Sequence, residues 1–229
     1  MQKKKGHLAE LRLFAGEEQA LIACPPEMVP APGQYLLAAE RGAIHAIPLF
    51  FAGTWKQGFL AVKPHQVMWQ PGTVLTLFGP LGNGFHLPGD AQRLAMLEMG
   101  NSNSCLLPMV RLMNYPDARV TLFSNAPMVD LPPEMEAYPM QDFPDSLDWA
   151  DFFIVDLPLE NVDSLSMIFP QTVLRPVGIR GQVLVQGKMP CCGVGKCGVC
   201  SIKVKRAWRL ACEDGPVFDL AGVLQGLDT

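Results

Sequence analysis

Four cysteines near the C-terminus carry the clearest chemical signal in this chain. They are Cys192, Cys197, Cys200 and Cys212. Five of the seven cysteines in the chain lie between residues 191 and 212. Thiolates are strong ligands for iron and zinc. Clustered cysteines in a reducing compartment bind metal or react more often than they form structural disulfides. The clustering therefore predicts a metal centre.

The spacing of these cysteines points to one kind of centre. The first three follow a C-x4-C-x2-C pattern, and the fourth comes 12 residues after the third. This is the arrangement that holds a [2Fe–2S] cluster in plant-type ferredoxins. Three interleaved glycines, Gly193, Gly195 and Gly198, allow the sharp bends that a loop needs to wrap a compact cluster. Their N–H groups can also point at the cluster sulfurs.

Two alternatives to this assignment come from the cysteines themselves. A four-cysteine zinc site remains open, although such sites use two short C-x2–4-C pairs. Cys191 stands directly beside Cys192, and the four-residue gap selects Cys192 as the ligand. Cys24 and Cys105 are isolated in the sequence, so we expect them to be small buried apolar residues.

Composition and charge restrict the remaining function classes. The chain has 229 residues, of which 49% are hydrophobic and 17% charged, with a net charge of −4. These values predict a globular protein with no basic field for nucleic acid. The lysine run Lys3–Lys5 is expected to be a solvated, frayed end. No signal peptide or bilayer-length apolar stretch is visible, so we expect a cytoplasmic protein that does not bind membranes.

The N-terminal and central parts of the chain show different patterns. Short apolar runs separated by Pro and Gly predict a small antiparallel barrel; its strands are expected at 34–38, 44–51, 58–62 and 74–78. Strand–helix–strand order beyond residue 90 predicts an α/β lobe. Its strands are expected at 93–99, 119–123 and 151–155, with a helix at 106–113 and a loop over 127–148.

The third segment begins near Gly178. A strand at 182–186 precedes the cysteine loop, and a closing hairpin is expected at 202–204 and 208–211. The fold class is thus α+β and multidomain. The expected domains are a flavin-type barrel over 1–89, a degenerate nucleotide-binding α/β lobe over 90–177 and a cluster-binding module over 178–229.

Several motifs together resemble a known family. They are the segments 189–200 and 212–218, with Gly79–Phe85 and Pro32–Tyr35 earlier in the chain. In this order they resemble the electron-transfer subunit of two-subunit dihydroorotate dehydrogenases, which serve pyrimidine biosynthesis. The resemblance implies a ferredoxin-reductase-like fold, with a Greek-key FAD barrel, a nucleotide lobe and a [2Fe–2S] module. In that family, electrons pass from NADH to FAD, through the cluster, to FMN in a partner subunit.

The resemblance also implies site residues and a partner. It places Gly79, Pro80, Leu81 and Gly82 at the FAD of the barrel. It implies a flavoprotein catalytic subunit of the dihydroorotate dehydrogenase kind as partner, and hence a hetero-oligomer.

The sequence departs from the family where its nucleotide cofactors bind. Ile47–Phe50 stands where the family has an arginine that holds the flavin pyrophosphate, and an apolar side chain cannot pair a phosphate. The segment 100–108 lacks the family's run of glycines, which allows close approach to a pyrophosphate. Asp156 would repel such a phosphate. We therefore expect an intact cluster module and no NAD(H) binding, and we leave FAD binding open.

The leading hypothesis is an accessory subunit that passes electrons one at a time to or from a flavoprotein partner. It assigns no catalytic residues to the chain and does not make it a stand-alone enzyme. One alternative is a complete FAD-dependent NADH reductase subunit. The other is a non-redox interaction protein in which the cluster or a zinc ion only stabilises the C-terminus.

Overall fold

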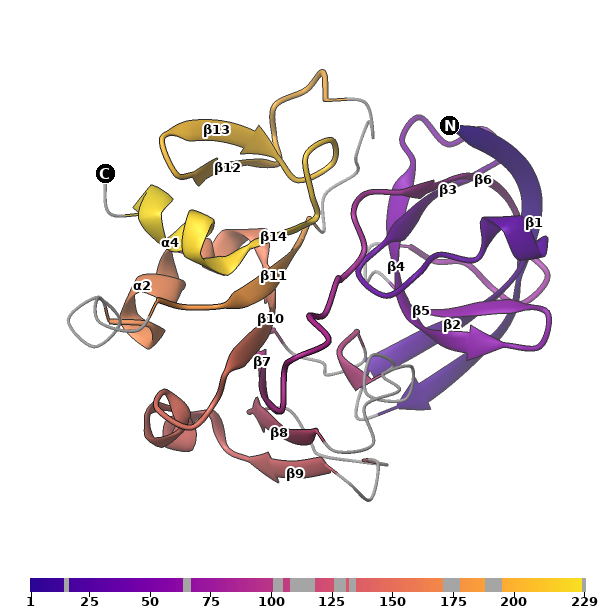
Figure 1. The fold of residues 1–229 in the computed structure, drawn as a ribbon. Helices are drawn as coiled ribbons and strands as arrows, with labels where there is room; N and C mark the ends of the chain where they lie inside the picture. The colour runs from indigo at the N-terminus through magenta and orange to yellow at the C-terminus, as the bar shows by residue number, and fades with distance from the viewer. Residues whose placement is uncertain are drawn as a thin grey trace.

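The chain forms a closed barrel and a six-stranded sheet, with a small hairpin on one side of the sheet (Figure 1). The computed structural model describes residues 1–14, 17–63, 67–100, 105–107, 118–125, 131, 135–170, 178–187 and 195–227. The barrel and the sheet lie side by side, and the hairpin lies beyond the sheet's C-terminal strands. Cys197, Cys200 and Cys212 line a pocket that they share with barrel residues and with Val185 of the sheet, so they lie where the parts meet.

Six antiparallel strands close the barrel in the order β1-β2-β5-β4-β3-β6. Their bounds are β1 (Gln2–Phe14), β2 (Glu17–Ala23), β3 (Tyr35–Glu40), β4 (Ile47–Trp55), β5 (Gly58–Val62) and β6 (Val74–Leu81), with the short 3-10 turn η1 (Pro26–Met28) after β2. The interior is filled by fully buried side chains such as Leu8, Ile22, Leu36, Leu49 and Phe59. The four barrel strands predicted from the sequence are confirmed.

The N-terminal lysine run is not a frayed end, and that prediction was wrong. Lys3, Lys4 and Lys5 lie in β1 and pair with residues 76–78 of β6. The backbone of this run closes the barrel while the long side chains stay at the surface. Lys3 Nζ lies 5.5 Å from the centre of the Phe78 ring, and Lys4 pairs with Glu27 at 3.4 Å. The pairing of this run with β6 therefore outweighed the tendency of three adjacent lysines to stay fully solvated.

The second sheet has the order β14-β11-β10-β7-β8-β9, parallel except for β14. Its strands are β7 (Arg93–Glu98), β8 (Arg119–Ser124), β9 (Met135–Tyr138), β10 (Phe152–Pro158), β11 (Gly181–Gln186) and β14 (Val217–Asp219). The strands predicted near 93–99, 119–123, 151–155 and 182–186 are confirmed. The helix predicted at 106–113 falls mostly outside the described residues.

The segment predicted as a loop over 127–148 is partly ordered, so that prediction was incomplete. It contains β9 and the 3-10 segment η2 (Met140–Ser146). Phe143 of η2 packs edge-on against Phe123, Phe153 and Phe169, with ring centroids 5.2 to 6.0 Å apart. One buried aromatic side chain thus holds a Pro-rich, acidic segment against the sheet.

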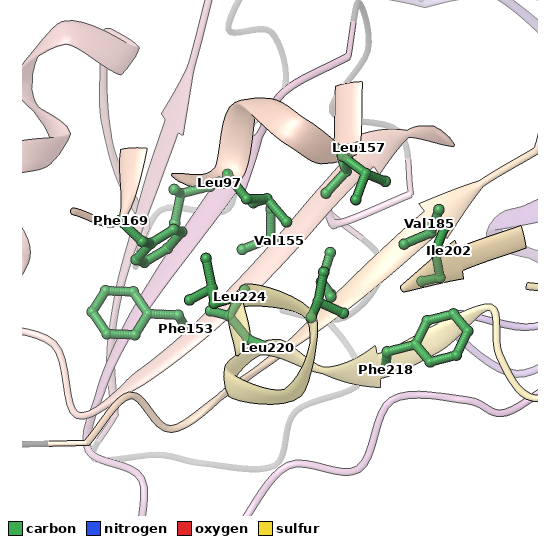
Figure 2. Packing of buried hydrophobic residues seen from close by; sticks show 14 of the residues in the cluster. Leu97, Phe153, Val155, Leu157, Phe169, Val185, Ile202, Phe218, Leu220 and Leu224 are labelled. Atoms are coloured by element: carbon green, nitrogen blue, oxygen red, sulfur yellow. The ribbon is translucent and has the colours of Figure 1, made fainter. Parts of the chain in front are cut away.

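Each face of the sheet has its own apolar core. Alternate residues of β7 and β10, such as Leu97 and Val155, face the C-terminal helix α4 (Leu220–Leu227), as Figure 2 shows. The 3-10 segment η3 (Leu159–Ser164) and the short helix α2 (Leu165–Ile168) cover the same face. Met96 and Ile154 face the opposite side, where Leu106 packs. All seven residues of β10 are buried, as expected for a central parallel strand.

The hairpin of β12 (Ser201–Val204) and β13 (Ala207–Leu210) packs on α4. The Lys205 amide donates to the Gly222 carbonyl at 2.6 Å, and Gly226 lies directly against the backbone of Lys203. The hairpin predicted from the sequence is confirmed. The division into three domains stays a prediction; β11 and β14, from its third segment, are hydrogen-bonded into the sheet of the second. No helix in the described ranges is long and apolar enough to cross a membrane.

We expect Gly226→Ala to lower the free energy of unfolding. Alanine normally improves a helix by about 1 kcal/mol over glycine. Here the added methyl group would collide with the carbonyl of Lys203, which is backbone and cannot move aside cheaply. Overpacking of this kind costs roughly 1–3 kcal/mol. Urea unfolding measures the change, with Gly89→Ala as the control because nothing lies within 4 Å of its added methyl. If Gly226→Ala and Gly89→Ala had the same free energy of unfolding, the close contact between Gly226 and Lys203 would be contradicted.

Candidate metal centre

The β12–β13 hairpin brings two of the predicted ligands together. Cys200 immediately precedes β12, and Cys212 lies two residues after β13. Because Ser201 pairs with Leu210, the residues just outside the hairpin also meet. The Ala211 amide donates to the Cys200 carbonyl at 3.0 Å, and the Cys212 amide donates to Cys200 Sγ at 3.4 Å. Both side chains are 8% exposed. Buried thiols with an amide beside the sulfur suit a cluster that needs both shielding and hydrogen bonds.

Cys197 lies on a loop with two left-handed glycines. Gly195 and Gly198 have φ of +68° and +70°, a conformation that other residues rarely adopt. The Ser201 hydroxyl and amide both donate to the Gly198 carbonyl, which closes the turn between the second and third ligands. Cys197 is exposed and lines the same pocket as Cys200 and Cys212. The predicted role of the glycines in bending this loop is thus visible at two of three positions.

Two of the cysteines lie outside the described residues. They are Cys191 and Cys192. The set of four ligands therefore remains a prediction. Among the described residues, no group of three His, Cys, Asp or Glu side chains is close enough to hold a metal ion. Cys200 and Cys212 are the pair that the structure brings together. The donor chemistry of three thiols around one apolar pocket fits an iron–sulfur cluster.

The pocket beside the thiols lies between the barrel and the cysteine segment. Its lining includes Tyr35, Pro48 and Phe50 from the barrel and Cys197, Cys200 and Cys212 from the C-terminal segment. Nearly all of this lining is apolar. A pocket of low polarity shields a charged cluster from water and strengthens each hydrogen bond to its ligands. Barrel residues are therefore part of the environment of the centre.

A buried tyrosine connects the barrel to the fourth predicted ligand. The Tyr35 hydroxyl donates to the carbonyl of Cys212 at 3.3 Å, and the tyrosine is 2% exposed. Its ring packs against Phe50 with centroids 5.3 Å apart. Tyr35 thus fixes the backbone of a ligand 177 positions away in the sequence. The sequence analysis found Tyr35 only within a family motif and gave it no role.

The turn that carries Cys212 is held by an aspartate that the sequence analysis missed. Asp214 accepts from the Leu210 amide at 2.8 Å and from Arg209 Nη1 at 3.2 Å. Its own amide donates to the Leu210 carbonyl at 2.8 Å. An Asp that bonds backbone groups of its own turn is a common turn signal, and its place two residues after a ligand could have revealed it.

Of the four residues predicted at FAD, Gly82 lies against this turn. Gly79, Pro80 and Leu81 end β6, and Gly82 follows. A side chain at Gly82 would collide with Pro216. This close packing is a structural use for Gly82, and its assignment to FAD stays a prediction.

Asn83 fastens the end of β6 to the same turn. Its amide donates to the Gly215 carbonyl at 2.7 Å, and its side chain donates to the Asp214 carbonyl at 2.8 Å. Gln34 supports the segment from the barrel side, since its Nε2 donates to the Gly82 carbonyl at 3.0 Å.

Two buried carboxylates occupy the carboxyl end of the parallel strands, where nucleotides bind in open α/β sheets. Glu98 of β7 and Asp156 of β10 are neighbours in register and are 2% and 1% exposed. Ser124 donates to Glu98 at 3.1 Å, and Gln186 donates to Asp156. An acidic pair would repel a pyrophosphate, so these residues do not fit NAD(H). The sequence analysis identified Asp156 here but not Glu98.

Comparisons with known proteins agree with this geometry. Residues 188–224 match the family model described as the iron–sulfur cluster binding domain of dihydroorotate dehydrogenase B. The structure of an NADH-dependent reduced ferredoxin-NADP oxidoreductase superposes with a TM-score of 0.73, at 18% identity, over 97% of this chain and 92% of that one. The ferredoxin reductase of carbazole 1,9a-dioxygenase superposes with a TM-score of 0.59, at 16% identity, over 81% and 68%.

The fold is thus that of the ferredoxin reductases, and its C-terminal segment is an iron–sulfur cluster-binding domain. More particularly, the chain resembles the electron transfer subunit of dihydroorotate dehydrogenase B (NAD(+)) from Clostridium perfringens. The two are 25% identical over an alignment of 169 residues, which covers 65% of each chain. The gamma subunit of sulfhydrogenase 1 from Pyrococcus furiosus is 52% identical over 27 residues, which are 12% of this chain and 9% of that one. The chain thus spans less than two thirds of the length of either relative.

We expect Tyr35→Phe to loosen the turn that carries Cys212. The variant removes one buried hydrogen bond and keeps the ring against Phe50. Such a bond contributes about 1 kcal/mol to stability. Chemical denaturation of the cluster-loaded protein measures the loss. Tyr138→Phe, whose hydroxyl bonds an exposed carboxylate at 3.4 Å, is the control and should leave stability unchanged. If Tyr35→Phe left the free energy of unfolding unchanged, the Tyr35 hydroxyl would have no role in holding this turn.

We expect Cys24 and Cys105 to resist alkylation in the folded protein. Burial, with Glu27 nearby, raises the pKa of Cys24 from 9.0 to about 11. Burial, and then Asp156 and Glu98, raises the pKa of Cys105 well above its usual range. At pH 8 only about one Cys24 in a thousand is then thiolate, the form that reacts. Mass spectrometry after iodoacetamide at pH 8 should find both unmodified, and both modified in denaturant. The structure buries Cys105 as predicted but leaves Cys24 half-buried. Rapid labelling of either in the folded protein would contradict its raised pKa.

Proposed function

We propose that this chain is a [2Fe–2S] electron-transfer subunit whose cluster is held by Cys192, Cys197, Cys200 and Cys212. The observation that carries the proposal is the adjacent, buried pair Cys200 and Cys212, with Cys197 on the same apolar pocket. The match of residues 188–224 to an iron–sulfur cluster-binding domain supports it independently. The ferredoxin-type spacing, and not the two short pairs of a zinc site, favours iron.

The cluster supplies one-electron transfer when bound. The chain's residues prepare its surroundings. The Cys212 amide, 3.4 Å from Cys200 Sγ, stabilises negative charge on that sulfur and so raises the reduction potential. The barrel residues Tyr35 and Phe50 keep water from the buried side. Cys197 and its neighbour Val199 are exposed, so the opposite side stays open to a partner.

The proposed partner is a flavoprotein catalytic subunit of the dihydroorotate dehydrogenase kind, in a hetero-oligomer. The clostridial relative named above supports this choice, since it is an electron transfer subunit. A reducing compartment such as the cytoplasm suits thiolate ligands. The chain would then be an accessory subunit, with substrate chemistry left to its partner.

FAD has no step in this proposal. The barrel and the sheet meet in close contact beside Cys200 and Cys212. Nearby, Tyr35, Leu37 and Phe50 of the barrel pack directly on Leu184 and Val217 of the sheet. These residues fit a flavin ring poorly as they stand.

Protein purified without air should contain about two iron atoms and two sulfides per chain. Its visible absorption should bleach with dithionite. Cys200→Ala should lose most of this iron and colour, because it removes one of the two adjacent buried thiols. Cys105→Ala is the matched control, a buried cysteine outside the proposed set, and should keep both.

The outcomes separate the rival functions. A colourless protein that holds zinc and no sulfide would overturn the redox proposal in favour of a structural metal. Stoichiometric flavin released on heating, with NADH-dependent reduction of a dye, would favour a complete reductase. Full iron content in Cys200→Ala would overturn the ligand set.

A further inference from the structure

The outward face of the β12–β13 hairpin differs from its inward face. Lys203 pairs directly with Trp208, and opposite residues of an antiparallel pair project from the same side. Ile202, which projects the other way, is 3% exposed and belongs to the core against α4. Trp208 is 72% exposed. We call Lys203, Trp208 and the adjoining Val199 the hairpin face.

Positive charge gathers around the hairpin face. Residues 195–212 contain five cations and no acidic residue, although the chain as a whole has a net charge of −4. The cations are Lys196, Lys203, Lys205, Arg206 and Arg209. Within the described part of the chain, Arg209 pairs with Asp214 at 3.2 Å and the other four form no ion pair. Glu213 and Asp214 follow directly, and Glu213 lies against Gly195, so the excess of positive charge is on the hairpin itself. Such an excess on an otherwise acidic protein steers partners of opposite charge.

The hairpin face adjoins the proposed cluster. Val199 lies between Cys197 and Cys200 and is 54% exposed. β12 begins directly after Cys200, and β13 ends two residues before Cys212. In Figure 1 the hairpin stands clear of the barrel and lies on the far side of α4 and β14 from the sheet's other strands. Trp208 is four residues before Cys212, which at about 3.4 Å per residue of strand keeps the two within roughly 14 Å. A molecule seated on this face would therefore lie near the proposed cluster.

We infer that the hairpin face docks a redox protein whose electron-accepting centre is surrounded by carboxylates. This inference rests on the proposed function. An exposed tryptophan directly opposite a lysine in a cation-rich hairpin has the composition of an interface centre. Trp and Arg are enriched in binding hot spots, and carboxylates complement positive charge. Trp208 supplies apolar contact area, while Lys203 and Lys205 set orientation and the rate of encounter.

Stopped-flow oxidation of the dithionite-reduced protein tests the inference. Each oxidant takes one electron from the reduced cluster, so the product is the oxidised cluster and a singly reduced oxidant. The probes are oxidised flavodoxin, a small acidic flavoprotein, and two small ions, ferricyanide and hexaammineruthenium(III). The double variant Lys203→Glu with Lys205→Glu is compared with Arg41→Glu with Lys56→Glu. The control pair lies in exposed turns of the barrel and makes the same change of total charge.

For the unaltered protein, the rate with flavodoxin should fall steeply with added salt. The hairpin double variant should lower this rate about tenfold at low salt, lower the ferricyanide rate, and raise the hexaammineruthenium(III) rate. The control pair should change each rate less than twofold. Trp208→Ala should weaken flavodoxin binding at least fivefold and leave the ferricyanide rate unchanged. These results would support docking through this face.

Iron content and visible absorption, measured for every variant, keep the two proposals distinguishable. A protein without a cluster overturns the proposed function. If every variant holds a full cluster and neither the hairpin double variant nor Trp208→Ala changes the oxidation rate by flavodoxin, the docking inference alone is overturned. The protein could instead bind a single-stranded oligonucleotide or phosphatidylglycerol vesicles more tightly than flavodoxin. If the hairpin double variant loses that binding, the docking inference is also overturned and the face is assigned to a different anion.

Discussion

The attachment of the barrel to the turn after β13 is the constraint on which the rest of the site depends. Asn83 bonds the carbonyls of Asp214 and Gly215, and Tyr35 bonds the carbonyl of Cys212. None of these bonds uses a ligand side chain. The backbone that carries Cys212, the fourth predicted ligand, is therefore fixed by residues far away in sequence. A cluster bound here would depend on the barrel to hold the turn that carries Cys212, whether or not the barrel binds a cofactor of its own.

The sheet supplies the second half of this frame. Its face toward α4 buries Cys200 and Cys212 in the same apolar core as Leu97 and Val155. The cysteine segment is thus continuous with the largest core of the protein, and it does not hang from the surface as a separate lobe. Shielding by this core and hydrogen bonding at the sulfur act in opposite directions on the reduction potential, because low polarity disfavours added negative charge and an amide donor favours it.

Much of this structure could be predicted from local patterns, and the failures have physical causes. Spacing alone selected the thiols, because ferredoxin-type loops need fixed gaps between ligands. β10 was visible as a continuous apolar run, and the β12–β13 hairpin was also predicted correctly. β1 was missed since its lysines reflect the solvent face of a strand whose other contacts are non-local. The contacts of Tyr35 and Asn83 were not predictable, since each spans more than 130 positions of sequence.

The acidic pair at the ends of β7 and β10 limits how this lobe could be redesigned. Glu98 and Asp156 sit inside the sheet edge with hydrogen-bond partners of their own, Ser124 and Gln186. Grafting a glycine-rich loop onto this scaffold would not restore a coenzyme pocket, because the repulsion arises from the strands and not from the loop. A dinucleotide site at this edge would require changes at four strand ends together, because each carboxylate is bonded to a side chain on a neighbouring strand.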